Sequence, residues 1–165
     1  MKKIYNHKAI GISKFKLNSS SFKKTLSIAG RLAGFLKKAD IICLKGNLGA
    51  GKTVFAKGVA KGLSIKNAVT SPTFVIMQQY LSGKIPLNHF DLYRLDKIKD
   101  IADIGYEEYF YDDAVTLIEW PERLGKIFPK ECLLVELKIT GNTSRQILFS
   151  AKGARYQELL REFKI

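Results

Sequence analysis

The stretch DIICLKGNLGAGKTVFAKGVAKGL, residues 40–63, decides the fold of this chain. It opens with a short apolar run, residues 40–45, which is typical of a buried strand. A glycine-rich loop follows, and residues 52–63 then show the apolar spacing of a helix. A strand, a glycine loop and a helix in this order predict a phosphate-binding unit within an α/β sheet.

The loop matches the pattern G-x-x-x-x-G-K-[ST] at every position. Its residues are Gly46, Asn47, Leu48, Gly49, Ala50, Gly51, Lys52 and Thr53. Glycine lets the backbone pass close to a phosphate with no Cβ in the way, and the following helix adds the positive end of its dipole. We expect the Lys52 ammonium to reach the β- and γ-phosphates of a nucleotide, and the Thr53 hydroxyl to coordinate Mg²⁺.

The length and composition are those of an ordinary globular protein. The 165 residues suit a single domain over 1–165, with 46% apolar and 26% charged residues. No apolar run reaches the roughly 18 residues of a membrane span, and the N-terminus lacks the apolar stretch of a signal peptide. Cys43 and Cys132 lie in separate strand-like runs without a C-x-x-C pair, which favours buried thiols in a reducing compartment. We therefore expect a cytoplasmic protein.

The net charge is strongly positive, at +13 with a pI near 9.7. Such a balance favours anionic partners, namely nucleotides, RNA or an acidic protein surface. Only six of the 28 basic residues are arginines, and lysines scattered along a chain are also typical of a solvated surface. Charge alone therefore does not locate a site.

Strand and helix patterns alternate along the whole chain. We expect strands over 10–18, 40–45, 73–81, 85–93, 113–120, 131–140 and 145–151, with hairpin turns at 82–84 and 141–144. We expect helices over 19–39, 52–63, 95–110, 121–127 and 154–165. The predicted fold is an α/β P-loop sheet with a parallel core, added antiparallel strands and helices on both faces.

A phosphate loop of this kind needs a second metal carboxylate, which usually ends a neighbouring buried strand. The run AVTLIE supplies one, Glu119, where an aspartate is more usual. Trp120, the only tryptophan, comes next. Its ring is either a core or cover aromatic, or a ring that lies near the nucleotide.

Hydrolysis also needs a group that orients water or accepts its proton. The run NHFDLYRL offers the candidates His89, Asp91, Tyr93 and Arg94. Alternation along a strand places the first three on one face. Asp91 on that face is suited to position water or hold a metal-bound water, while His89 is equally suited to a structural hydrogen bond. The segment TSPTF, residues 70–74, brings Thr73 on a loop that is suited to sense the γ-phosphate and the metal, as switch loops do.

Four stretches together resemble one family. GNLGAGKT, SPTF, HFDLYRL and IEWPE occur in this order within about eighty residues. This is how the TsaE family looks, whose members are small bacterial ATPases required to make threonylcarbamoyladenosine at position 37 of tRNAs that read codons starting with A. A P-loop is shared by many families, whereas HFDLYRL with IEWPE is much more specific.

The resemblance implies a set of roles. It makes Thr53 and Glu119 the magnesium ligands, Asp91 the residue that supports hydrolysis, Thr73 a switch-loop residue and Trp120 a neighbour of the nucleotide. It also implies weak ATP hydrolysis that acts with the partner proteins TsaD and TsaB. TsaD transfers the threonylcarbamoyl group, and ATP turnover resets that complex between cycles, so that contact with tRNA is indirect.

The chain departs from the family pattern at two positions, one in the loop and one directly after it. Asn47 stands where aspartate is usual, and Val54 where a second threonine is common, but Thr53 keeps the metal role. Two other functions stay open at this point. A small-molecule or nucleoside kinase would also need an acceptor pocket and an arginine-bearing lid, and an RNA-binding module would show salt-dependent RNA affinity that ATP does not alter.

Overall fold

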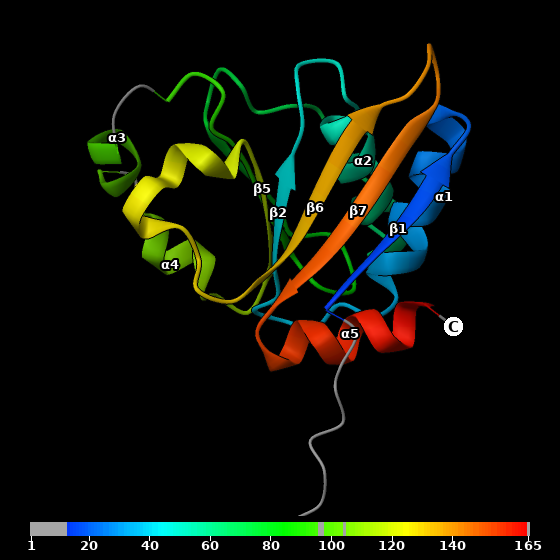
Figure 1. The fold of residues 1–165 in the computed structure, drawn as a ribbon. Coiled ribbons are helices and arrows are strands. Elements are labelled where there is room, and N and C mark those ends of the chain that lie inside the picture. Colours follow the sequence, from blue (N-terminus) through cyan, green and yellow to red (C-terminus); the bar gives the residue numbers. More distant parts are fainter. Residues whose placement is uncertain (1–12, 96–97, 104, 165) are drawn as a thin grey trace, which may run out of the picture.

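The computed structural model describes residues 13–95, 98–103 and 105–164, and within them it forms one mixed sheet of seven strands (Figure 1). The strands are β1 (Lys14–Ser19), β2 (Ile41–Lys45), β3 (Met77–Tyr80), β4 (Leu87–Asp91), β5 (Val115–Glu119), β6 (Cys132–Ile139) and β7 (Arg145–Lys152). The helices are α1 (Phe22–Ala33), α2 (Lys52–Gly62), α3 (Ile98–Ala102), α4 (Tyr106–Phe110), α5 (Ala154–Lys164) and the 3₁₀ helix η1 (Pro121–Ile127).

The strand order is β1-β7-β6-β2-β5-β4-β3. The four central strands, β6, β2, β5 and β4, are parallel, while β1, β7 and β3 pair with antiparallel neighbours at the two sides. This arrangement confirms the predicted parallel core with antiparallel additions. It also places β2, the strand before the glycine loop, in the middle of the sheet.

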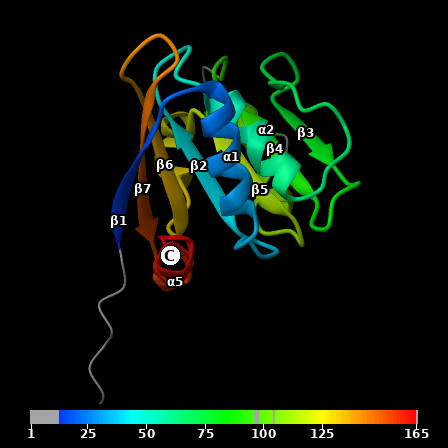
Figure 2. The ribbon, with the colours of Figure 1, turned by 90° about the vertical axis from the view of Figure 1, so that its right-hand side faces the viewer.

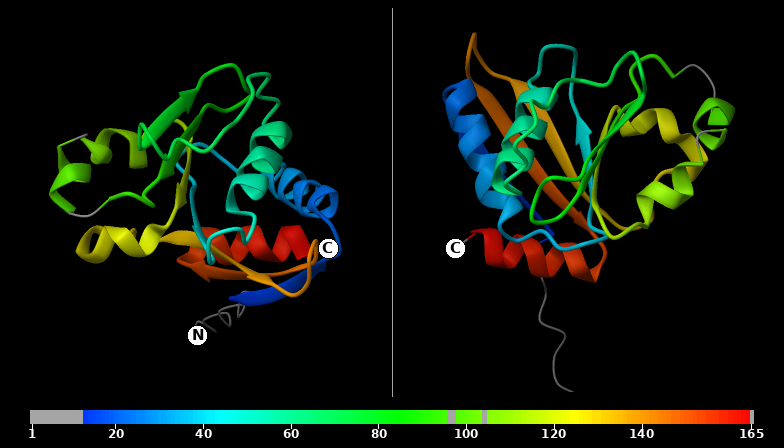
Figure 3. Two further views of the ribbon diagram at one scale, coloured as in Figure 1. Left: turned by 90° about the horizontal axis from the view of Figure 1, so that it is seen from above. Right: turned by 180° about the vertical axis from the view of Figure 1, so that it is seen from behind.

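Helices cover both faces of the sheet, as predicted (Figures 2 and 3). The side chains of β2 show why. Ile42 and Leu44 join a core formed with α1, α2 and α5, whereas Ile41 and Cys43 join a second core on the side of α3, α4 and η1. A strand buried on both faces has a continuous apolar sequence, which IICL provides. Cys43 and Cys132 are both buried with free thiols.

Several predicted elements are shorter than their patterns. The pattern over 95–110 breaks into α3 and α4, because Gly105 takes a left-handed conformation with φ of 70°. The strand expected from Thr73 begins only at Met77, since residues 73–76 form a turn that ends at Ile76, with φ of 66°. The first three residues of the strand predicted over 10–18 lie outside the described residues.

The paired helices α1 and α2 approach closely and run in the same direction. Gly58 faces Leu26 and Ala29, and one turn further along both helices Gly62 faces Gly30. A Cβ at Gly58 would lie 2.6 Å from both the Leu26 carbonyl oxygen and the Ala29 Cβ. The glycines therefore set the distance between the two helices. None of the helices in the described part of the chain is long and apolar enough to cross a membrane.

Replacing Gly58 by valine should destabilise the fold. The added methyl groups have no space against the α1 backbone, and overpacking of this kind costs about 1–3 kcal/mol. We expect a lower urea midpoint for Gly58→Val, with Lys57→Ala on the exposed side of α2 changing stability by less than about 0.5 kcal/mol. Equal midpoints for the two variants would contradict this account of the helix contact.

Candidate nucleotide-binding site

The predicted site residues come together at one edge of the sheet. Because β2, β5 and β4 are parallel, their carboxyl ends meet there, and ligands of open α/β sheets bind outside such an edge. The register sets Glu119 beside both Leu44, which ends the buried part of β2, and Asp91, which ends β4. A cleft of about 390 Å³ opens above these residues, and the loop after β2 forms one of its walls.

The glycines of the loop are required by its backbone path. Gly46, Gly49 and Gly51 have φ values of 148°, 76° and 99°, which other residues rarely adopt. A Cβ on Gly46 would also lie 2.6 Å from the Leu137 carbonyl oxygen. Helix α2 then begins at Lys52, and no side chain caps its N-terminus. The first N–H groups of α2 are thus available for an anion.

Lys52 is buried and lies inside the curve of the loop. Its Nζ donates hydrogen bonds to the carbonyl oxygens of Gly46, at 2.6 Å, and Asn47, at 3.1 Å. Burial lowers the pKa of Lys52, and the carboxylates of Glu119 and Asp91 oppose that shift. Within the described residues the ammonium forms no ion pair. It is therefore a buried cation held by neutral carbonyls, a state that a bound anion would stabilise.

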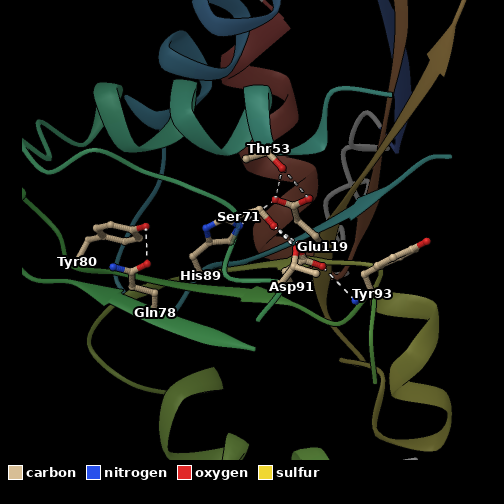
Figure 4. A network of polar contacts seen from close by, with 9 residues as sticks. Thr53, Ser71, Gln78, Tyr80, His89, Asp91, Tyr93 and Glu119 are labelled. Atoms are coloured by element: carbon tan, nitrogen blue, oxygen red, sulfur yellow. Dashed lines mark hydrogen bonds and ion pairs between the residues drawn. The ribbon is translucent and has the colours of Figure 1, made fainter. Parts of the chain in front are cut away.

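Glu119, at the end of β5, connects Thr53 of α2 to His89 of β4 (Figure 4). The Thr53 hydroxyl donates to its two carboxylate oxygens, at 3.2 and 3.3 Å, and His89 Nε2 lies 2.9 Å from Oε1. Both Glu119 and His89 are buried. His89 thus makes the structural hydrogen bond that the sequence left as one of two alternatives, and it fixes the carboxylate opposite Thr53.

A hydroxyl beside a carboxylate is the oxygen donor set that Mg²⁺ prefers. The described residues hold no cluster of three or more His, Cys, Asp or Glu side chains that could bind a metal by themselves. Mg²⁺ in nucleotide sites takes one or two protein ligands, with phosphates and water as the others. Thr53 and Glu119 fit that requirement.

Asp91 ties the segment after α2 to the end of β4 (Figure 4). Its Oδ2 accepts hydrogen bonds from the hydroxyls of Ser71 and Thr73, the latter at 2.5 Å. Its Oδ1 accepts from the backbone N–H of Tyr93 at 3.0 Å. Phe90 packs into the core on the other face of the sheet, as the predicted alternation requires. Asp91 and Thr73, predicted separately, therefore form one hydrogen-bonded unit in the wall of the cleft.

Trp120 lies on the wall of the cleft and not in the centre of the core. Its backbone is left-handed, with φ of 59°, which turns the chain sharply from β5 into η1. Its ring centroid lies 3.7 Å from Lys52 Nζ and 5.1 Å from the ring of Tyr93. The half-buried indole thus forms a cation–π contact with the loop lysine.

The remaining loop residues contribute mainly backbone. The side chains of Asn47 and Leu48 are exposed, while Ala50 is buried beneath the loop. Val54 lines the cleft in the first turn of α2. Asn47 is an x position of the loop, which acts through its peptide group, and Val54 follows the loop within α2, where Thr53 keeps the hydroxyl.

Two residues of the site had no signal in the sequence. Phe22 reads as part of the apolar face of a helix, yet its ring lines the cleft because α1 begins beside the start of α2. Arg145 reads as the first residue of a strand, yet it donates hydrogen bonds to the loop carbonyls of Gly49 and Ala50. Both lie far from the loop in sequence, so only the packing of the sheet shows them.

The parallel core and its strand–loop–helix unit place the chain in the P-loop fold class. Comparison with known families identifies one family within this fold class. The model of the family described as "Threonylcarbamoyl adenosine biosynthesis protein TsaE" matches residues 19–147, and the chain belongs to this TsaE family.

Individual relatives are similar over most of their length. The tRNA threonylcarbamoyladenosine biosynthesis protein TsaE of Bacillus subtilis is 42% identical over 140 residues, which cover 85% of this chain and 87% of that protein. The TsaE of Treponema pallidum is 39% identical over 121 residues, 73% of this chain and 87% of that protein. The crystal structure of Bacillus subtilis YdiB superposes with a TM-score of 0.81 at 37% identity, over 92% of this chain and 94% of that one. These findings confirm the resemblance and the predicted fold.

Removing the Asp91 carboxylate should loosen the segment that it holds. In Asp91→Ala the hydroxyls of Ser71 and Thr73 lose their shared acceptor, so we expect faster amide hydrogen exchange over residues 70–76. Asp113→Ala is the matched control, because Asp113 is an exposed carboxylate paired with Lys38. Unchanged exchange in 70–76 would mean that the backbone contacts of the segment hold it without Asp91.

Proposed function

We propose that this protein is the ATPase subunit of the system that makes threonylcarbamoyladenosine at position 37 of tRNAs reading codons that start with A. Family membership supports the pathway. The observation that carries the ATPase assignment is the convergence of Lys52, Thr53, Glu119 and Asp91 at the carboxyl edge of three adjacent parallel strands. The proposed activity is ATP hydrolysis, weak for the isolated protein and stimulated by its partners.

In this proposal the loop and α2 hold the phosphates of ATP. The backbone N–H groups at the start of α2 and the Lys52 ammonium bind the triphosphate, and Lys52 exchanges its contacts with Gly46 and Asn47 for phosphate oxygens. Thr53 and Glu119 hold Mg²⁺, and His89 keeps the Glu119 carboxylate oriented. The bound metal neutralises charge on the phosphate oxygens.

Asp91 is the residue that we assign to hydrolysis. It lies in the same cleft as Thr53 and Glu119 and accepts hydrogen bonds, which suits a carboxylate that orients a water or takes its proton. The Thr73 hydroxyl donates a hydrogen bond to the same carboxylate, so a movement of the 70–76 segment changes the hydrogen bonding of Asp91. We propose that this segment responds to the γ-phosphate as a switch loop does.

The proposed role in the pathway is to reset a transferase and not to transfer the group. TsaD and TsaB are the proposed partners, TsaD transfers the threonylcarbamoyl group, and ATP turnover by this chain returns their complex to the start of the cycle. Contact with tRNA is indirect, and the place of action is the cytoplasm. The chain acts as a single domain over residues 1–165.

The decisive experiment measures ATP hydrolysis by the purified protein alone and with the matching TsaD–TsaB complex. We expect slow turnover that rises with the complex. Lys52→Ala should reduce it by at least about a hundredfold, because the main phosphate cation is lost. Asp91→Ala should retain much of the ATP affinity yet cut turnover on the order of a hundredfold.

Two results would count against the proposal. Turnover that the complex does not stimulate would separate this protein from the transferase, and a screen of small-molecule phosphate acceptors would then test the kinase alternative. Wild-type turnover in Asp91→Ala would remove Asp91 from the hydrolytic step.

Glu119→Gln should change the magnesium dependence of the reaction. The amide is a weaker ligand for a hard cation, so we expect the Mg²⁺ concentration for half-maximal turnover to rise at least about tenfold. Glu108→Gln, on the exposed side of α4, should leave that concentration unchanged. An identical titration for wild type and Glu119→Gln would exclude Glu119 as a metal ligand.

A further inference from the structure

Arg145, the first residue of β7, is buried against the phosphate loop from outside the cleft. It is 4% exposed, and each of its guanidinium nitrogens donates to a backbone carbonyl. Nε donates to Ala50 at 2.8 Å and Nη2 to Gly49 at 3.1 Å. Nη1 donates to Gly141 at 3.0 Å and to Ser144 at 2.8 Å. One side chain therefore joins the phosphate loop to the turn between β6 and β7.

These contacts determine which way the loop peptides face. In a trans peptide the C=O of one residue and the N–H of the next point in opposite directions. Arg145 holds the Ala50 carbonyl, so the Gly51 N–H is directed away from the guanidinium. Gly51 lines the cleft, and it is the N-cap residue that precedes α2. The Ala50 N–H is bonded within the loop to the Asn47 carbonyl, so the orientation of the Gly51 N–H is the one that Arg145 sets most directly.

The charge of Arg145 also bears on the loop. Among the described residues it forms no ion pair, and all its partners are neutral carbonyls. A buried cation without a counter-ion is costly, and an anion bound across the loop lowers that cost. The guanidinium lies 5.4 Å from the Phe22 ring, so an aromatic face and not an acid covers its other side.

We propose that Arg145 is a positioning residue for phosphate binding, which deepens the proposed function and rests on it. Its planar fork holds the Gly49 and Ala50 carbonyls so that the Gly51 N–H faces the cleft, and its uncompensated charge raises the affinity of the loop for anions. Arg145 itself does not touch the nucleotide. Its effect is transmitted through the backbone of Gly49, Ala50 and Gly51.

The test measures the affinity of three variants for Mg²⁺–ATP and for tripolyphosphate by calorimetry. Arg145→Met keeps the apolar stem and loses the fork and the charge, and we expect the Kd for both ligands to rise at least about tenfold. Arg145→Lys keeps the charge without the fork, so its Kd should lie between, at least about threefold above wild type. Because Arg145 acts on the phosphate loop, the factor by which Kd rises should be the same for Mg²⁺–ATP and for tripolyphosphate. KM should rise with Kd while kcat changes less than about threefold.

Arg155→Met is the matched control. Arg155 is also an arginine with a carbonyl contact, to Phe35, and it pairs with the buried Asp40 at 2.6 Å, far from the cleft. Its loss should lower the melting temperature but leave both Kd values within about twofold. If Arg145→Met does not fold, Arg145→Lys provides the same comparison.

The inference is overturned if the Arg145 variants bind both ligands with wild-type Kd, or lose no more affinity than Arg155→Met. A wild-type protein that binds neither ligand would overturn the proposed function together with this inference. If the wild-type protein binds both ligands and the Arg145 variants bind them with the same Kd, the inference alone is overturned.

Discussion

The parallel pairing of β4, β5 and β2 is the constraint on which the site depends. Parallel strands end at a common edge, so Asp91, Glu119 and the phosphate loop come together although some seventy residues separate the loop from Glu119. Helices cover each side of the sheet, which suits the continuous apolar run of β2. The neighbouring strands β4 and β5 also carry buried polar residues, Asn88, His89 and Thr116 within the strands and Asp91 and Glu119 at their ends.

The buried carboxylates of the site have hydrogen-bonding partners, whereas His89 Nδ1 has none among the described residues. Glu119 accepts from Thr53 and pairs with His89, and Asp91 accepts from Ser71 and Thr73. A buried carboxylate without such partners would be strongly destabilising. The same bonds keep each oxygen in a fixed direction, so the stability of this edge and the order of the site have a common origin.

The local parts of the fold and site could be predicted from the sequence, and the long-range contacts could not. The loop, Glu119 and Asp91 each follow from a short pattern whose chemistry is evident from neighbouring residues. The division of residues 95–110 into two helices depends on the left-handed backbone of Gly105, and a glycine within a helical pattern is compatible with either outcome. The contact of Arg145 with the loop could not be predicted, because Ala50 and Gly49 lie 95 and 96 residues away and accept through backbone carbonyls, which every residue type has.

The position of Trp120 has a consequence for the optical properties of the protein. It is the only tryptophan of the chain, and its half-buried ring lies beside an ammonium group in the cleft wall and outside the apolar centre of either core. The intrinsic emission therefore reports the polarity and occupancy of one edge of the sheet. An unfolding curve followed by this emission describes the cleft, and its agreement with a far-ultraviolet dichroism curve is a test of whether the cleft and the helices lose their order together.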